Sequence, residues 1–273
     1  SRIEHTWHNG KCTFCGASQS EYDRDQALES HAYQFIHTTK PEELFKMKFD
    51  VIVGNPPYQL SDGSGNGAGA VPIYQKFVHQ AKKLNPRYLT MIIPSRWFSG
   101  GRGLDEFRDE MLSDKRLTKI VDFFDSNECF PGVDISGGVS YFLWERDTTK
   151  DCEITTIRSG AKSVMDRPLL ENKCDSFIRF NEAISIFRKI RKYKESGFKE
   201  LISSAKPFGL RTFFQGKLQP FKDSIKIITN KNIGYIKEDE VLQNAQWINK
   251  YKVYISYAYG ERGAFPYLVI GKP

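Results

Sequence analysis

The amino-acid sequence predicts an α/β protein in which an open sheet is followed by a smaller α+β domain. Up to about Lys150, short apolar stretches rich in β-branched residues alternate with stretches of helical periodicity. Beyond Lys150 the pattern changes to one basic helix and short, aromatic-rich strands. The charge changes there too, because residues 1–150 carry 18 basic and 20 acidic side chains while residues 151–273 carry 22 and 13. With 273 residues, 40% of them apolar, the chain is long enough for two domains.

The first strand is predicted at residues 49–54, where a short β-branched run fits a strand buried on both faces. Asn55-Pro56-Pro57 ends it, because proline has no amide hydrogen to give to a sheet. Residues 61–70 are rich in Gly and Ser and contain no core-forming side chain, so they are predicted as a loop. A helix is predicted at residues 73–84, where Ile73, Phe77, Ala81 and Leu84 recur at helical spacing.

The later elements continue this alternation. Further strands are predicted at residues 88–93, 117–124 and 138–144, with a helix at 104–112. Alternating strands and helices imply a largely parallel sheet with right-handed crossovers. After them come a basic helix at 181–193 and a strand at 251–257. We place a domain boundary near residues 146–155, and we expect three parts, namely residues 1–45, 46–150 and 151–273.

Two broad classes of protein are excluded by simple counts. The longest apolar runs, such as residues 89–94 and 267–270, are far shorter than the roughly 20 residues that cross a bilayer. No basic-then-apolar leader opens the chain, so we expect a soluble, cytoplasmic protein with no membrane partner. The five cysteines are an odd number and mostly isolated, which favours reduced thiols over a disulfide framework.

The tetrapeptide Asn55-Pro56-Pro57-Tyr58 stands at the carboxyl end of the first predicted strand, where open α/β sheets bind ligands. The Asn55 side-chain oxygen and the Pro56 carbonyl offer two acceptors, which the double proline holds in place. Two such acceptors suit the exocyclic amine of adenine, whose lone pair is freed when both N–H bonds are drawn away. Tyr58 adds an aromatic face for an unstacked base, worth roughly 1–3 kcal/mol. A rigid turn is the alternative interpretation.

These residues resemble motif IV of the gamma-type amino-methyltransferases, and later residues resemble the methylase domain of type IIG restriction-modification enzymes. The later matches are Pro72-Ile73-Tyr74-Gln75-Lys76-Phe77, Met91-Ile92-Ile93-Pro94-Ser95-Arg96-Trp97, Gly100-Gly101-Arg102-Gly103-Leu104, Phe107-Arg108, Cys129-Phe130-Pro131-Gly132-Val133 and Gly137-Gly138-Val139. The resemblance is strong over residues 46–146. It implies a Rossmann-like sheet, S-adenosylmethionine as the methyl donor, and the N6 amine of a flipped adenine as the acceptor. It also implies that Phe130 stacks on that base, with an ordinary core phenylalanine as the alternative.

Residues 151–273 resemble the target-recognition region of the same enzymes more loosely, through Pro207-Phe208-Gly209-Leu210-Arg211-Thr212 and Tyr251-Lys252-Val253. This resemblance and the excess of positive charge imply double-stranded DNA as the partner. The candidate DNA contacts are Arg211, Lys217, Lys222 and Arg262. Each of these could equally be a solvated surface charge.

The family binds S-adenosylmethionine with a Phe-x-Gly-x-Gly turn upstream of motif IV, and no such turn precedes Asn55. The glycine run at residues 63–69 does not directly follow a strand, so it is interpreted as a lid or connector. We therefore expect a fragment that supplies only the edge of the cofactor site, at Asn55 and Pro56, and that is inactive by itself. Exposed sheet edges would favour self-association of such a fragment.

Cys12-Thr13-Phe14-Cys15-Gly16 has the form of a zinc knuckle, in which glycine allows the turn that brings two thiolates onto one ion. Two more ligands are needed. His5 and His8 lie just upstream, and they are preferred to His31 and His37, whose spacing of six puts them on different faces of a helix. The alternative is that both thiols are free.

Two other functions remain open at this point. One is methylation of a protein glutamine or of an RNA guanine amine, since such an amide or amine also suits an Asn-Pro-Pro-Tyr site. The other is a DNA-binding module whose methylase part is an inactive remnant. No Pro-Asp…Glu-x-Lys nuclease pattern is present in the sequence, and the recognised DNA sequence cannot be deduced from the residues.

Overall fold

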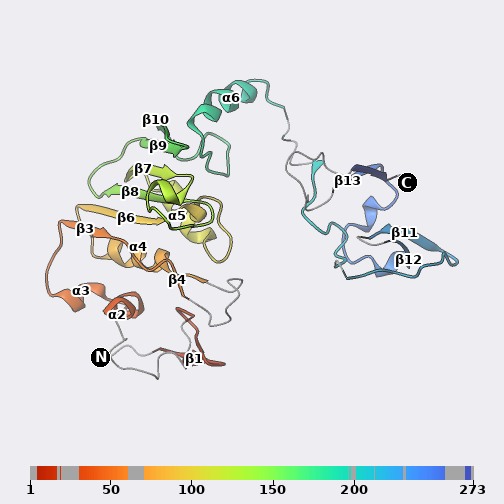
Figure 1. Ribbon diagram of the computed structural model, residues 1–273, viewed down its shortest axis with the longest axis horizontal. Helices are drawn as coiled ribbons and strands as arrows, with labels where there is room; N and C mark the ends of the chain where they lie inside the picture. Colours follow the sequence, from red (N-terminus) through yellow and green to blue (C-terminus); the bar gives the residue numbers. More distant parts are fainter. Residues whose placement is uncertain are drawn as a thin grey trace. The chain divides into compact units, whose positions relative to one another are not determined.

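The computed structural model describes residues 5–16, 19, 31–60, 71–195, 197, 201–211, 213–229, 232–255 and 268–271 (Figure 1). The chain divides into two compact units, Ser1–Lys192 and Tyr193–Pro273. In the parts of the chain that are described, no helix combines the length and the apolar character needed to cross a membrane.

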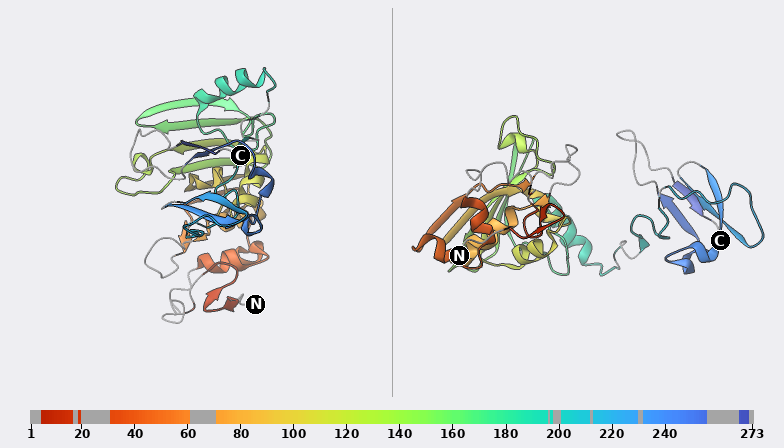
Figure 2. Two further views of the ribbon diagram at one scale, coloured as in Figure 1. Left: turned by 90° about the vertical axis from the view of Figure 1, so that its right-hand side faces the viewer. Right: turned by 90° about the horizontal axis from the view of Figure 1, so that it is seen from below.

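The first unit is built on one six-stranded sheet, whose strands lie side by side in a twisted layer (Figures 1 and 2). The strands are β3 (Val51–Gly54), β6 (Tyr88–Pro94), β7 (Leu117–Phe123), β8 (Val139–Glu145), β9 (Cys152–Arg158) and β10 (Ala161–Arg167). Their order across the sheet is β10-β9-β7-β8-β6-β3. Every predicted strand before Lys150 is therefore found, within two residues at either end.

The sheet is mixed, which corrects the prediction of a largely parallel one. Parallel pairing is limited to β3 with β6 and β7 with β9. The pairs β6–β8, β7–β8 and β9–β10 are antiparallel. The reason is that β7 reaches β8 through the loop 124–138, which holds no crossover helix, so the two strands run in opposite directions.

Two helices cover one face of this sheet. They are α4 (Tyr74–Lys83) and α5 (Asp105–Ser113), preceded by the short 3₁₀ helix η2 (Ser95–Phe98). The two helices are joined by Lys82, whose ammonium lies 2.9 Å from Glu110 and 3.1 Å from Asp114. Between the helices and the sheet lies the core. Its largest buried side chains include Trp97, Trp144, Tyr74, Phe107 and Phe142.

The opposite face of the sheet is partly open. Val51 and Val53 of β3 are 54% and 74% exposed, and Tyr141 of β8 is 39% exposed. The strand register places all three on the same face, away from α4 and α5. Along its outer edge, β3 pairs with no strand among the described residues.

The first unit extends beyond the boundary expected near residues 146–155. Strand β9 pairs with β7 in the middle of the sheet, and α6 (Asn181–Arg191) packs on β10. The Asn181 amide, which is buried, donates to the carbonyl of Ile154 at 2.9 Å. The apolar side chains of β9 are buried by pairing within the sheet, which explains why β9 belongs to the first unit. The unit therefore ends only at Lys192.

A small cluster precedes β3. It contains β1 (Trp7–His8), β2 (Lys11–Cys12), α2 (His31–His37) and α3 (Pro41–Phe45). The two short strands form an antiparallel pair, and Cys12, Cys15 and Ile36 form an apolar cluster with Ile73 and Phe77 beside or within α4. After Tyr58, β4 (Gln59–Leu60) pairs with β5 (Val71–Pro72), and the expected loop at 61–70 between them lies outside the described residues.

The second unit contains two antiparallel pairs. They are β11 (Ser224–Ile228) with β12 (Ile233–Lys237), and β13 (Lys252–Ile255) with β14 (Leu268–Gly271). The 3₁₀ helices η5 (Glu238–Glu240) and η6 (Ala245–Trp247) follow β12. Gly234 is required for close packing, because a Cβ there would lie 1.9 Å from the carbonyl oxygen of Gln215.

Candidate active site

Asn55-Pro56-Pro57-Tyr58 lies at the carboxyl edge of the sheet, directly after β3. The same edge holds the end of β6, because β3 and β6 are parallel with Gly54 opposite Met91. It also holds the start of β8, because Val139 lies opposite Pro94 at the end of β6. Three loops from separate parts of the chain therefore meet at this edge, as open α/β sheets require for a ligand site.

Asn55 is available to a ligand. It is exposed, and among the residues that the structure describes its amide has no hydrogen-bond partner. Pro56 is buried and Pro57 exposed, so the loop is anchored through its second residue. The carbonyl of Tyr58 accepts from the amide of Ile73 at 3.2 Å, which ties the end of the loop to the start of α4.

Tyr58 is half-buried, and its ring packs against the main core. Its hydroxyl is buried, and no hydrogen-bond partner lies within the described part of the chain. Burial, and then the nearby Cys129, raises the pKa of Tyr58 to about 12. The hydroxyl is therefore neutral at ordinary pH.

The loop 124–138 brings Phe130 to the same neighbourhood, since Cys129 lies close enough to affect Tyr58. Ser126, which is buried, organises the loop: its hydroxyl donates to the carbonyl of Val133 at 2.7 Å and accepts from the amide of Ile135 at 2.8 Å. Phe130 itself is half-buried, and its amide donates to the carbonyl of Ser126 at 2.7 Å. The structure thus brings the loops of both predicted stacking residues together.

Gly138 closes the Phe130 loop. It adopts a φ of +83°, and a Cβ there would lie 2.1 Å from the carbonyl oxygen of Phe123. Only glycine fits this close approach, so the loop must return to the end of β7 before β8 begins.

A buried ion pair supports the edge and was not predicted from the sequence. Asp122 of β7 is fully buried and accepts from the Ser95 hydroxyl at 2.6 Å. Its two oxygens also accept from Nε and Nη2 of Arg179, each at 2.8 Å. The Arg179 guanidinium donates further to the carbonyl of Gly137 at 2.9 Å. An aspartate within the apolar run 117–123 was the available signal, because a buried carboxylate needs a partner.

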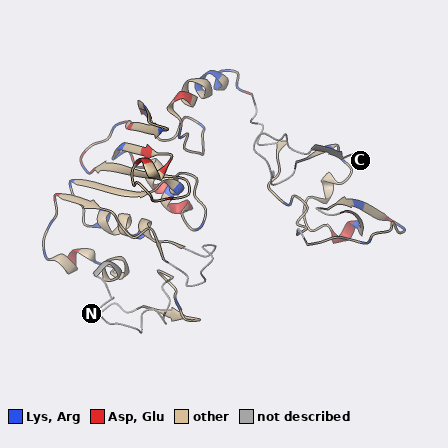
Figure 3. Cartoon of the chain, viewed as in Figure 1, with Lys and Arg blue, Asp and Glu red and all other residues tan. Residues whose placement is uncertain are grey.

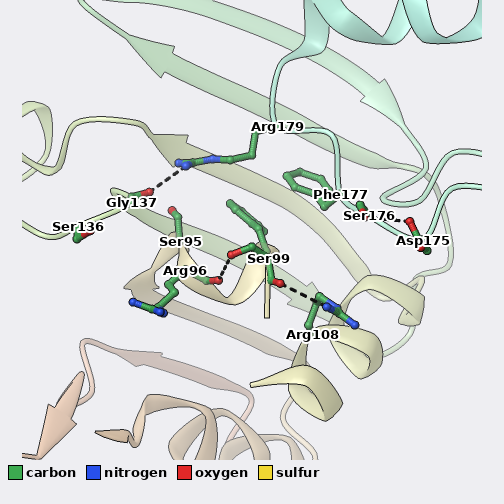
Figure 4. Close-up of a pocket in the computed structure, with 11 residues that line it drawn as sticks. Ser95, Arg96, Ser99, Arg108, Ser136, Gly137, Asp175, Ser176, Phe177 and Arg179 are labelled. Atoms are coloured by element: carbon green, nitrogen blue, oxygen red, sulfur yellow. Dashed lines mark hydrogen bonds between the residues drawn. The ribbon is translucent and has the colours of Figure 1, made fainter. Parts of the chain in front are cut away.

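A cavity of about 420 Å³ opens beside this ion pair (Figure 4). Its lining combines serine and arginine side chains with aromatic rings. The lining residues are Ser95, Arg96, Phe98, Ser99, Arg108, Ser136, Gly137, Asp175, Ser176, Phe177 and Arg179. Arg108 and Arg179 point into it from α5 and from the segment before α6, yet each is already paired with aspartate. Neither Asn55 nor Phe130 lines the cavity, so it neighbours the candidate base site without forming it.

Four metal-ligating side chains come together at the N-terminal cluster. They are His5, Cys12, Cys15 and His37, and their ligand atoms all lie within 4.8 Å of one another. His8 is not part of this group, although it was preferred from the sequence. In β1, His8 alternates with Trp7 and lies opposite Lys11 on the exposed face, whereas Trp7 lies opposite Cys12 on the buried one. His37, at the end of α2, is the member of the group that comes from this helix.

The candidate DNA contacts belong to the second unit. Arg211, Lys217 and Lys222 are exposed, and Arg262 lies outside the described residues. The backbone of Lys217 pairs with that of Tyr235, and its ammonium lies 4.6 Å from the centre of the Phe221 ring. Figure 3 marks the basic residues of both units, including those in the last turn of α6.

Comparison with known proteins finds similarity to methylases over the first part of the chain. Residues 1–130 match the Eco57I restriction-modification methylase family. The chain is 45% identical over 146 residues to an uncharacterized adenine-specific methylase of Mycoplasma pneumoniae, an alignment that covers 50% of this chain and 35% of that protein. The chain thus spans about a third of the length of this homologue.

Two solved structures align with parts of this chain at low identity. One is the methyltransferase subunit of a type I system from Streptococcus thermophilus, with 13% identity, a TM-score of 0.29, and coverage of 56% of this chain and 34% of that one. The other is the type IIG restriction endonuclease BpuSI, with 16% identity, a TM-score of 0.30, and coverage of 40% and 15%.

Proposed function

We propose that this chain, whose residues 1–130 match the Eco57I methylases, carries the adenine-binding site of a DNA methyltransferase in a restriction-modification enzyme. The reaction is transfer of a methyl group to the N6 amine of an adenine that has left the duplex. The observation that carries this proposal is Asn55, exposed and without a partner among the described residues, directly after β3 and beside the buried Pro56.

The chemical role of this loop is to hold the amine of adenine. The amide oxygen of Asn55 accepts one N–H, and the carbonyl of Pro56 accepts the other. The two acceptors draw both N–H bonds away, which reduces delocalisation of the nitrogen lone pair into the adenine ring, so the lone pair can point at the incoming methyl group. Pro56 and Pro57 fix the backbone, and the acceptors need no rearrangement when the base arrives.

The base also needs a replacement for the stacking that it loses on leaving the duplex. The ring of Tyr58 supplies one face, and Phe130 on the adjoining loop supplies the other. This assignment is supported by the position of Cys129, the residue before Phe130, which lies near enough to Tyr58 to raise the pKa of its hydroxyl.

S-adenosylmethionine supplies the methyl group in this family. The described residues do not form a full nucleoside site, because none of the described strands is followed by a Phe-x-Gly-x-Gly turn. Asn55 and Pro56 would touch only the methyl end of the cofactor, so we expect isothermal titration to find weak affinity in this chain alone. The free edge of β3 and the exposed Val51 and Val53 support docking of further sheet there. Without such a partner the same surface would favour self-association.

Double-stranded DNA is the proposed partner of the second unit. Residues 193–273 carry 13 basic and 7 acidic side chains, and the described Arg211, Lys217 and Lys222 are exposed. Neutralising backbone phosphates is the ordinary use of such an excess of charge.

The test uses the intact enzyme that contains this chain. Asn55→Ala should lower kcat by about 10²-fold or more, as for loss of one preorganised transition-state hydrogen bond, while the affinity for DNA is retained. Asn249→Ala is the matched control, because Asn249 is also an exposed asparagine but lies in the second unit. Transfer of labelled methyl groups, followed by nucleoside analysis, identifies the product. Unchanged turnover in Asn55→Ala, or label in protein or RNA instead of N6-methyladenine, would contradict the proposal.

A further inference from the structure

We propose that His5, Cys12, Cys15 and His37 bind one zinc ion, which fastens residues 5–16 to helices α2 and α4. We call residues 5–16 the knuckle. The four side chains come from the approach to β1 (His5), the end of β2 (Cys12), the turn after β2 (Cys15) and the end of α2 (His37). Two thiolates and two imidazoles form a donor set that is typical of closed, structural zinc sites.

The four ligand atoms lie near enough to converge on one ion, and one pair already has the spacing of a tetrahedral site. All four ligand atoms lie within 4.8 Å of one another, and Sγ of Cys15 lies 3.5 Å from Nδ1 of His5. A sulfur and a nitrogen that share one tetrahedral zinc, at bond lengths of about 2.3 and 2.0 Å, are separated by about 3.5 Å. The pair therefore stands at the separation that coordination requires.

The donors are buried and oriented. Cys12 and Cys15 are 3% and 1% exposed. Nε2 of His37 is buried, and within the described part of the chain it has no hydrogen-bond partner. A buried ring nitrogen without a partner is costly, and a metal bond at this atom removes that cost. The His5 ring stacks on Trp7 at 4.9 Å and meets the His37 ring edge-on at 4.4 Å, so both imidazoles are held by packing.

The backbone of the turn is shaped for two thiolates. The amide of Thr13 donates to the carbonyl of Thr6, and the amide of Gly16 donates to the carbonyl of Cys12, both at 2.9 Å. Gly16 has a φ of +80°, which other residues rarely adopt. These bonds curl residues 12–16 so that both sulfur atoms lie on the inner side of the knuckle.

The site rests on α4. Ile73 and Phe77 pack against the two cysteines, and the ammonium of Lys76 lies over the Phe14 ring and donates to the Phe14 carbonyl. From the other side, the amide of Gln80 donates to the carbonyls of Phe35 and Thr38, both at 2.6 Å, and so holds α2 and its end to α4. A zinc ion here would close a ring of contacts that runs from the knuckle through α2 to α4.

This ring reaches the candidate base site. The amide of Ile73, which packs on the knuckle cysteines, donates to the carbonyl of Tyr58. Loss of zinc should therefore loosen the loop that carries Tyr58. The effect of this loosening on methylation rests on the function proposed above. The binding of zinc itself does not depend on that function.

The first experiment counts metal in the full 273-residue chain, produced without a histidine tag and with zinc in the medium. We expect about one zinc per chain by elemental analysis. X-ray absorption at the zinc edge should show two sulfur ligands at about 2.3 Å and two nitrogen ligands at about 2.0 Å. Less than about 0.2 zinc per chain, or a shell without sulfur, would overturn the proposal. This measurement needs no variant, so a variant that fails to fold cannot obscure it.

The second experiment separates His37 from His8. Cys12→Ser, Cys15→Ser and His37→Ala should each reduce bound zinc at least about 10-fold. His8→Ala is the matched control, because His8 is in the same strand pair but on the exposed face, and it should retain zinc fully. Loss of zinc in His8→Ala together with its retention in His37→Ala would show that the proposed set of four ligands is wrong. Since zinc content is measured without DNA or methyl donor, failure here and failure of the methyltransferase proposal remain distinguishable.

Discussion

At the residue scale, Tyr58 shows how burial selects one of two roles that a tyrosine could have. The pKa of its hydroxyl is raised to about 12 by burial and by Cys129, and the raised value favours the neutral form in the folded protein. Any stability linked to this group is therefore present below its ordinary pKa of 10 and is lost only as the pH rises towards 12. Between pH 6 and 9, the hydroxyl should contribute no titration to activity.

Substitution of Tyr58 in the intact enzyme tests the role of the ring. Tyr58→Phe should keep kcat/KM within about 3-fold of the wild type, because the π-face is retained. Tyr58→Ala should lower kcat/KM by about 5- to 150-fold, which corresponds to a stacking free energy of roughly 1–3 kcal/mol. Steady-state methylation of duplex DNA measures both. A Phe variant as impaired as the Ala variant would show that the hydroxyl matters.

The same scale shows what sequence reasoning can reach. Asn55, Pro56 and Tyr58 could be proposed from the sequence because the signal is local: a short strand, a double proline and an aromatic ring follow one another directly. The partners of Asp122 and the cysteines are not local. Arg179 is 57 positions beyond Asp122, and His37 reaches the knuckle only through a helix whose placement no spacing reveals.

At the scale of elements, the Asp122–Arg179 pair joins β7 to the segment before α6. Asp122 is fully buried, so Arg179→Ala would leave an unpaired carboxylate inside the protein. We expect a loss of about 3–5 kcal/mol in the free energy of unfolding. Arg179→Lys should recover only part of it, since a single ammonium cannot replace the two parallel bonds of the guanidinium.

Urea denaturation followed by circular dichroism measures this loss. Arg146→Ala is the matched control, because Arg146 pairs with the exposed Asp147 at the surface, and it should cost far less stability than Arg179→Ala. Equal effects of the two alanine variants would mean that the buried pair does not anchor the segment.

Another inter-element contact is Asp114, at the end of α5. It accepts from Nε of Arg116 at 2.8 Å and from Nε1 of Trp144 at 2.9 Å, and it lies 3.1 Å from the ammonium of Lys82. Burial alone would raise the pKa of Asp114, but these hydrogen bonds and charges hold it well below its usual 3.8. Glu110 behaves similarly, since the nearby His79 imidazole, 2.9 Å away, and the Lys82 ammonium outweigh burial and lower the pKa of Glu110 to about 2.

The direction of the pH dependence follows. The pKa values of both carboxyl groups are lowered in the folded state. Their contribution to the free energy of unfolding is therefore present above about pH 4.5 and is lost as the pH falls towards 2. Asp114→Asn should lower the free energy of unfolding by about 2–3 kcal/mol at pH 7. It should also weaken the fall of that free energy between about pH 4.5 and 2. Asp109→Asn, at an exposed position on the same helix, is the control. Denaturation between pH 2 and 7 gives both slopes, and identical slopes for Asp114→Asn and wild type would contradict this account.

At the scale of the whole molecule, the alternation of strands and helices gave the correct α/β class and located four of the six strands of the sheet, but not β9 and β10. It did not give their directions. Two strands joined by a long loop look the same in sequence whether they run parallel or antiparallel, and the loop 124–138 has no helical period to decide between them. The end of the first unit was also set by pairing across the sheet, because β9 joins β7, which lies earlier in the chain.

The charge of the second unit leads to a prediction for DNA binding. A well-folded sample of this chain should bind duplex DNA with an affinity that falls steeply as salt is raised. The slope of the logarithm of the binding constant against the logarithm of the salt concentration reports the number of phosphates neutralised. Lys217→Ala or Lys222→Ala should each reduce the slope by about 1 if the residue contacts a phosphate. Fluorescence anisotropy between about 50 and 200 mM salt is the measurement. Binding that ignores salt, or that is absent, would remove DNA contact from this unit.

The division after Lys192 also has a consequence for inheritance. Every strand of the six-stranded sheet, the Asp122–Arg179 pair and α6 lie upstream of that point. A genetic exchange that replaces the coding sequence from Tyr193 onward would therefore leave the six-stranded sheet and the Asn55 loop intact, whereas an exchange at residues 146–155 would cut β9 and β10 from the sheet. If the second unit reads DNA as proposed, new DNA specificities would arise by recombination at one position, without any compensating change in the unit that carries the proposed adenine site.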